Sequence, residues 1–336
     1  MRRALLCLTL LAAFVGAGRV HAGGVADVVA AKGNLVGRNL SGLDLTGADL
    51  RGANLTRATL DGAILTGATL VGAHLAGATL RGADLREAYL RDVRGRGANF
   101  GQARLGGADL TRADLREANF ERADLTRAVL EAAQLSRAAL TGAFLPGARL
   151  ARAKLVGADL TSAMLVAADL TQADLTGAML KSAELGAGRL AESAPGAARL
   201  GGATLVKANL GGANLKNVYL REAILTEAIL TGSDLGWADL TWARAKGADF
   251  SKASLAWAIG YGADFSWANF VQATLTHTQL VGASLVRADF RSARLQATNF
   301  EHANLAGADF GDADASHALF NAARNVPTGV GRAKTP

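Results

Sequence analysis

Large apolar residues recur at every fifth position along most of this chain. From Leu35 to Phe320, all but five of the positions at this spacing hold Leu or Phe, and the frame never shifts. Two positions before them, from Ala48 to Ala318, Ala fills nearly every place. A five-residue period fits neither the α-helix, with about 3.6 residues per turn, nor the simple alternation of a β-strand. The pattern therefore predicts a repeat built from five-residue units.

Each unit indicates a chain that turns a corner every five residues. In extended backbone, residues two apart point to the same side, so the Ala and the Leu of a unit can both face inward. Gly stands second after the apolar residue in 22 units, for example Gly62 and Gly67, where it eases turn geometry. Asp or Asn often precedes the apolar residue, and these side chains hydrogen-bond nearby backbone in turns.

Units such as Ala48-Asp49-Leu50-Arg51-Gly52 and Ala113-Asp114-Leu115-Arg116-Glu117 resemble the repeat of the pentapeptide-repeat family. The resemblance extends over residues 35–324. It implies an all-β fold, a right-handed quadrilateral parallel β-helix (a pentapeptide-repeat solenoid), with four units in each coil. The units from Leu35 to Phe320 would then make about 14 coils. At about 4.8 Å per coil, the rod would be roughly 70 Å long.

Four units per coil mean that residues 20 apart should stack. The central residues Phe250, Phe270, Phe290 and Phe310 recur at this spacing. The units without a central Leu or Phe are centred on Gly95, Pro195, Ala245, Gly260 and Ala315. Counting by twenty places Gly95, Pro195 and Ala315 on one side of the coil. We expect the chain to bulge outward at residues 91–97, 186–196 and 242–262.

The two ends of the chain differ from the repeats. Arg2 and Arg3 precede an uncharged, mostly apolar run from Ala4 to Gly18, and residues 20–22 (Val-His-Ala) suit cleavage of a signal peptide. We expect residues 1–22 to be that signal peptide, with the mature chain beginning at Gly23 and exported to the periplasm or the exterior of a bacterium. An uncleaved membrane anchor is disfavoured because a spanning helix needs about 20 residues, so no transmembrane segment is expected in the mature chain. Residues 23–34 are expected to cap the solenoid, and residues 325–336 to form a disordered tail.

The formal charge of +7 shrinks when the ends are set aside. Between residues 23 and 324 there are 31 basic and 29 acidic residues. Even the arginine-rich stretch from Arg81 to Arg137 combines 11 arginines with nine acidic residues. A mixed surface of this kind argues against nucleic acid as a partner.

No catalytic, cofactor-binding or metal-binding motif is recognisable in the sequence. The one cysteine, Cys7, lies in the expected signal peptide, which removes disulfides, thiolate ligands and cysteine nucleophiles from the mature chain. His277, His302 and His317 are expected at outward positions, with His277 and His317 two coils apart. A filled coil also leaves no cavity for a catalytic pair of carboxylates. We therefore expect a protein that is not an enzyme and has no cofactor.

The four tryptophans are the least repeat-like feature, and all lie between residues 237 and 267. Counting by twenty places Trp237, Trp257 and His277 in one corner column, with Trp242 and Tyr261 around the adjoining side. Exposed aromatic clusters tend to mark binding sites, and flat rings in a row would suit sugar rings or an apolar segment of a partner. The same side chains could instead pack against a bulge at residues 242–262. Both interpretations stay open.

Two classes of function follow. The first is a non-enzymatic, exported scaffold or interaction protein that presents the surface of a rigid rod to a protein or an envelope polymer, including an envelope glycan bound by the aromatic residues. The second rests on the resemblance, because some pentapeptide-repeat proteins mimic duplex DNA and modulate topoisomerases. That role requires an acidic rod in the cytoplasm, so the near-neutral body and the expected signal peptide favour the first.

Overall fold

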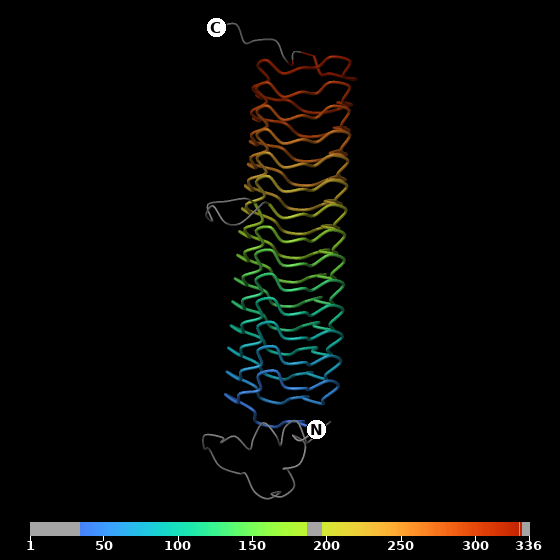
Figure 1. The fold of residues 1–336 in the computed structure, drawn as a ribbon. Helices are drawn as coiled ribbons and strands as arrows, with labels where there is room; N and C mark the ends of the chain where they lie inside the picture. Colours follow the sequence, from blue (N-terminus) through green and yellow to red (C-terminus); the bar gives the residue numbers. More distant parts are fainter. Residues whose placement is uncertain (1–33, 187–196, 329, 331–336) are drawn as a thin grey trace, which may run out of the picture.

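The protein is a rod of stacked coils (Figure 1). The structure is a computed structural model, and it describes residues 34–186, 197–328 and 330. The chain runs from one end of the rod to the other, so that residues close in space are one coil apart in sequence (Figure 1).

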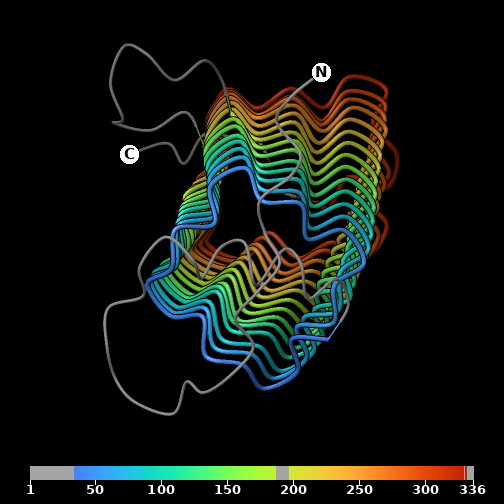
Figure 2. The ribbon, with the colours of Figure 1, turned by 60° about the horizontal axis from the view of Figure 1, so that its bottom comes forward.

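Each coil has four sides, which are visible in Figure 2. Every side contributes one residue to a column of parallel β-bridges. We name the sides face 1 to face 4 by the first residue of each column, which are Asn34, Asn39, Asp44 and Asp49. The column of face 1 reaches Arg324 in fourteen steps, which confirms the predicted number of coils. Within the described ranges no helix forms, and each side of the coil is held to its neighbours by the parallel bridges and the backbone hydrogen bonds around them.

The hydrogen bonds made by the five backbone N–H groups of a unit show why Asp or Asn so often precedes the central residue. In the unit 108–112, Ala108 donates across the preceding corner at 3.0 Å, while Asp109, Leu110 and Arg112 donate to backbone carbonyls of neighbouring coils at 2.7–2.9 Å. The remaining N–H group, that of Thr111, has no backbone acceptor and donates to the side chain of Asp109 at 3.0 Å. Buried or partly buried N–H groups need such partners. The Asp or Asn before the central residue therefore completes the hydrogen bonding of the unit, as the sequence predicted.

The second residue after the central one forms the corner. All 22 glycines predicted there have positive φ, between 61° and 69°. Because the N–H of the following residue donates to the carbonyl of the central residue, as Ala48 does to Leu45 at 3.0 Å, the corner is a type II turn. Residues with side chains take the same conformation at the other corners, for example Arg57 at 57° and Trp237 at 61°.

The interior holds the central Leu or Phe and the Ala of each unit, as predicted. Phe270 is fully buried and stacks between Phe250 and Phe290, with ring centroids 5.0 Å from each. Phe100 and Phe120 stack in the same way at 4.8 Å. Residues twenty apart in the sequence therefore lie on adjacent coils in both halves of the rod.

The bulges expected at residues 91–97 and 242–262 are absent, and that prediction is wrong: both segments keep the regular bridges of the coil. Neighbouring side chains fill the space that a missing Leu would leave. A Cβ built on Gly95 would lie 3.1 Å from Leu115, and one built on Gly260 would lie 3.1 Å from the ring of Phe265. The core therefore absorbs a small central residue without deforming the backbone.

The coil is interrupted once, where bridged partners lie ten positions further apart in the sequence than elsewhere. Asp169 pairs with Arg199, and the three following pairs have the same offset. The corner nevertheless closes across this point, because the N–H of Ala198 donates to the carbonyl of Leu185 at 2.8 Å. Ten extra residues therefore enter the chain at one corner; the bulge predicted at 186–196 falls on residues 187–196, outside the described part of the chain.

This offset moves every later unit by half a coil relative to counting by twenty. The column that contains Arg94 passes through Arg244, so Gly95 shares face 1 with Ala245. Ala315 follows Asp314 on face 3, opposite to face 1. The prediction that Gly95 and Ala315 lie on one side is therefore wrong, and Pro195 lies outside the described residues.

The ends of the chain are described only in part. The expected signal peptide and nearly all of the expected cap at 23–34 fall outside the described residues. Of the expected tail, Val326 and Val330 are partly buried against the last coils. Across residues 34–186 and 197–330, leaving out 329, there is no helix with the length and apolar character needed to cross a membrane.

Candidate interaction surface

The predicted patch consists of four exposed rings and the half-buried ring of His277, around the coils that contain residues 235–281. We call Trp237, Trp242, Trp257, Tyr261 and His277 the aromatic patch. Its three tryptophans are 44–61% exposed and Tyr261 is 42% exposed. All but Tyr261 stand at corners with positive φ, and Tyr261 directly precedes one. The corner of Trp237 and Trp257 adjoins one edge of face 4, and the corner of Trp242 adjoins the other.

Trp237, Trp257 and His277 form a ladder of parallel rings, one per coil. The centroids of the two indoles are 4.9 Å apart, with 4° between their planes. The imidazole of His277 lies 4.0 Å from Trp257 at 17°. The sequence predicted the column but not the direction of the rings. Because Trp257 has a ring against each of its faces, it presents its edge to the outside.

Trp242 lies across the backbone of the next coil. A Cβ built on Gly262 would come within 2.3 Å of its indole, so the ring covers this glycine. The N–H of Trp242 donates to the carbonyl of Tyr261 at 2.9 Å, which places the two aromatic residues on adjacent coils at the same edge of face 4. The bulge that was to hold these side chains does not exist. They rest on regular coils and remain about half exposed.

The fourth tryptophan, Trp267, stands apart from the patch. It occupies the corner after face 1, and the guanidinium of Arg287, one coil further, lies 4.5 Å from its ring centroid. This cation–π contact is typical of an arginine above an indole. Trp267 is 52% exposed, so aromatic side chains occupy three of the four corners in this part of the rod.

The histidines at corners and the arginine-rich stretch are the other features that the sequence singled out. His277 and His317 lie in one corner column two coils apart, as predicted. Within the described ranges, no three His, Cys, Asp or Glu side chains come close enough to hold a metal ion. Glu117 pairs with Arg96 at 2.8 Å, while Arg137, one coil above it, adds only a weaker attraction.

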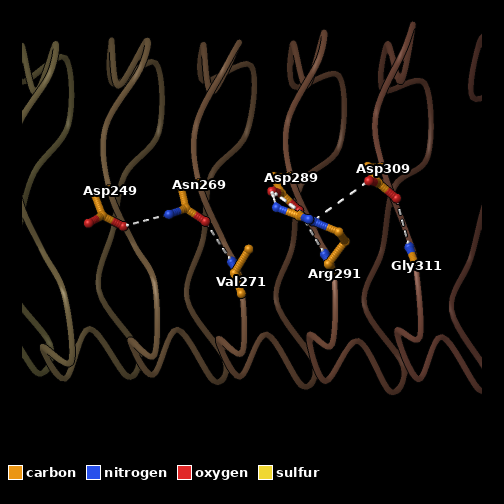
Figure 3. Close-up of polar contacts among 7 residues, drawn as sticks. All are labelled: Asp249, Asn269, Val271, Asp289, Arg291, Asp309 and Gly311. Carbon is orange, nitrogen blue, oxygen red and sulfur yellow. Dashed lines mark hydrogen bonds and ion pairs between the residues drawn. The ribbon is translucent and has the colours of Figure 1, made fainter.

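The aspartates of the repeat are engaged in structural bonds, as Figure 3 shows for face 2. Asn269 and Asp309 each accept the N–H two residues ahead, at 3.0 and 2.9 Å. Arg291 donates to Asp289 at 2.6 Å and lies 3.7 Å from Asp309. The hydrogen bond from Arg291 lowers the pKa of Asp289 below its usual 3.8, against the opposing effect of burial. Asp289 is therefore an ionised, hydrogen-bonded carboxylate, and it is not poised to take up a proton near neutral pH.

The fold defines a four-sided solenoid made of five-residue units. Pentapeptide repeats match this chain in eight copies, at residues 34–67, 65–94, 96–131, 133–172, 153–187, 198–236, 238–276 and 283–321. The chain therefore belongs to the pentapeptide-repeat family, whose fold is the right-handed quadrilateral β-helix.

Several solved structures are similar to this chain. HetL, a pentapeptide repeat protein involved in heterocyst differentiation regulation in the cyanobacterium Nostoc, is 25% identical, with 91% of this chain and 97% of HetL covered and a TM-score of 0.30. A pentapeptide repeat protein of the Arabidopsis thaliana thylakoid lumen is 30% identical over 34% of this chain and 72% of its own, with a TM-score of 0.22. QnrB1, a plasmid-mediated fluoroquinolone resistance protein, is 18% identical over 56% and 80%, with a TM-score of 0.35. No curated protein matches the sequence.

Proposed function

We propose that this chain is a non-enzymatic, exported interaction protein that binds a partner protein through the aromatic patch. The observation that carries the proposal is the exposure of three tryptophans and a tyrosine along the two edges of face 4. Trp and Tyr are enriched among the residues that dominate protein interfaces. Export is supported by the N-terminal sequence, in which Arg2 and Arg3 precede an apolar run and a small-residue cleavage site.

Stability of the coil gives no clear reason for tryptophan at these corners. A positive φ is a poor conformation for a bulky residue and costs about 1–2 kcal/mol. Stacking of two aromatic rings contributes about 0.5–1.5 kcal/mol, which roughly cancels that cost. Glycine stands at 22 equivalent corners without this strain, and at most of the other corners a small, polar or charged side chain accepts it. The tryptophans are therefore better explained by what they contact outside the coil.

At the corner of Trp237 and Trp257, the stacking of the rings favours a protein over a glycan. A sugar ring stacks on the open face of an indole, but both faces of Trp257 are covered by neighbouring rings. The exposed edges and the indole N–H groups instead suit apolar side chains and carbonyl acceptors of a polypeptide. The near-neutral body, with 31 basic and 29 acidic residues between positions 23 and 324, does not suit a mimic of duplex DNA.

The test compares two double variants as bait in the periplasmic and secreted fractions of the native host. Trp237→Ala with Trp257→Ala removes the ring ladder. Tyr89→Ala with Phe144→Ala removes two other exposed aromatic side chains, which are 52% and 39% exposed and lie far from the patch. A partner retained by the wild type and by the second variant but lost by the first supports the proposal.

The partner is then purified and titrated into each protein. Binding at the patch should shift tryptophan fluorescence in the wild type, and the shift should vanish in the Trp237→Ala, Trp257→Ala variant while its thermal melt stays nearly unchanged. Equal retention by both variants, or a response to envelope glycans and not to the protein, would overturn the proposed function.

A further inference from the structure

The stack sorts the charges of the rod by face. We count the outward positions of each unit from Leu35 to Phe320, which are the residue before the central one and the two after it. On face 1 the basic residues are Arg57, Arg94, Arg96, Arg116, Arg137, Lys154, Lys207, Arg244, Lys246 and Arg287, and the acidic ones are Asp114, Glu117, Asp174, Glu227 and Asp264. Ten cations thus stand against five carboxylates.

The other three faces carry a slight negative excess. Faces 2 and 3 each present five basic and seven acidic residues among the described positions, and face 4 presents seven and eight. The count above gives each corner residue to the face before it. If each corner residue is counted with the face after it, face 1 still has a positive excess and the other three faces a negative one. The near-neutral total therefore conceals a basic stripe along one side.

Most cations of face 1 form no ion pair within the described part of the rod, unlike those of face 4, although Arg287 contacts the ring of Trp267. On face 4 most of them are paired, for example Arg51 with Asp49 at 2.7 Å and Arg91 with Asp109 at 2.7 Å. Of the ten cations of face 1, those in ion pairs are Arg96, Arg116 and Lys207. Among the described residues, the other seven form no ion pair, and Arg94, Arg137 and Lys154 are exposed to solvent.

We propose that face 1 binds a linear polyanion of low charge density, a carboxylated polysaccharide laid along the rod. Arg57 and Arg287 are eleven coils apart, so ten cations are spread over about 53 Å, or one per roughly 5 Å. A polyuronate, with one carboxylate per sugar, has a charge density of this order.

Duplex DNA fits the same surface less well. It carries one charge per about 1.7 Å, roughly three times the density of these cations, so most of its phosphates would find no cation on face 1. An extended flat face also matches a thin chain better than a cylinder. The aromatic patch flanks face 4 and meets face 1 only at the corner of Trp242, so Arg94, Arg137 and Lys154 lie on a surface separate from the one that binds the proposed protein partner.

The test measures fluorescence anisotropy of labelled polygalacturonate oligomers, long enough to span the face, with the purified protein. The same titration uses labelled dextran, which is neutral, and a labelled DNA duplex. The first variant is Arg94→Gln with Arg137→Gln and Lys154→Gln. The control is Arg104→Gln with Arg122→Gln and Arg127→Gln, which removes three cations at the same height of the rod from faces 2 and 3.

We expect salt-sensitive binding of polygalacturonate and none of dextran. The first variant should lose at least about tenfold in affinity and show a shallower dependence on salt, because three ionic contacts are gone. The control, which has the same net charge, should lose less than about threefold. Absence of binding by the wild type, equal losses in the two variants, or tighter binding of the duplex than of polygalacturonate would each overturn the proposal.

Discussion

The indole of Trp242 covers Gly262 one coil further along, so closely that a Cβ at residue 262 would lie 2.3 Å from the ring. A second glycine one coil beyond, Gly282, has a similar positive φ of 68° but open space around its Cα. The two positions differ in their contact with the tryptophan and not in their backbone conformation.

Gly262→Ala should therefore displace the indole of Trp242, whereas Gly282→Ala should not. Both substitutions place a side chain at positive φ, which costs about 1 kcal/mol. The ring can swing outward, so the added cost for Gly262→Ala is expected to be small, but tryptophan emission should shift toward that of a solvated indole. Identical emission spectra for the two variants would show that Trp242 does not rest on Gly262 in solution.

Phe270→Ala should destabilise the rod by about 3–5 kcal/mol, because the buried ring stacks between two others and a coil held on both sides cannot collapse onto the cavity. The adjacent Val271 points outward, and Val271→Ser should cost less than about 0.5 kcal/mol. Urea unfolding of the two variants measures both values. Similar losses at the two positions would contradict the assignment of inside and outside.

Stability should fall in acid as the aspartates of the repeat take up protons. The hydrogen bond from Arg291 lowers the pKa of Asp289, and bonds from the hydroxyl and N–H of Thr46 lower that of Asp44, relative to 3.8. A pKa lowered by folding means that this stability is present above pH 3.8 and is lost as the pH falls through the folded-state value. Urea midpoints measured from about pH 6 downward should be flat and then decline below about pH 4.

The control for the acid transition is Asp44→Asn, since Asn299 and Asn119 already accept the same backbone N–H in other units. This variant should lose its share of the pH dependence and keep the fold. A decline that begins well above the ordinary aspartate pKa, or one that the substitution leaves unaltered, would point to other titrating groups.

Removal of residues 187–196 should leave a folded, uninterrupted rod. The corner across this point is already closed by the hydrogen bond from Ala198 to Leu185 at 2.8 Å. The deletion joins Gly186 to Ala197, which restores the five-residue spacing from Leu185 to Leu200. We expect a thermal melt close to that of the full chain. Loss of cooperative unfolding would show that the ten residues support the coils around them.

Export predicts that the protein isolated from its native host begins at Gly23. N-terminal sequencing of that protein, together with fractionation, gives the result directly. An intact Met1 on a cytosolic protein would contradict the localisation and reopen the question of an intracellular partner.

Most of the fold could be predicted from the sequence because each five-residue unit contains the residues for its own core position, corner and turn. The spacing of Leu50 and Leu55, the glycine at residue 52 and the aspartate at residue 49 specify core, corner and turn within one unit. Stacking by twenty then follows, and Phe250 and Phe270 lie in contact as expected. Weak units such as those centred on Gly95 were expected to bulge, since the sequence does not show that Leu115 fills the space.

The ten-residue insertion could not be predicted, because Leu190 and Pro195 continue the five-residue frame while the stack skips two units. The face on which any residue after position 196 lies, relative to those before position 187, depends on this insertion. The columns of Trp237 and Trp257 were found because both lie after it. The basic stripe was not found, because Arg94 and Arg244 share face 1 only when the offset is included.

The hydrogen bonds between coils join residues about one coil apart, so the rod grows by repetition and its surface is graduated in steps of about 4.8 Å. On face 1 the unit of Trp267 stands five coils beyond the unit of Lys154, a separation of about 24 Å that depends only on the number of units between them. Gain or loss of twenty residues would change such a distance by one step and leave the faces in phase. Gain of ten residues that join the coil would turn the following part by half a circuit and change which sites share a face. The number of whole coils between two sites therefore sets their distance along the rod, and an added half coil sets the side of the rod on which the second site lies.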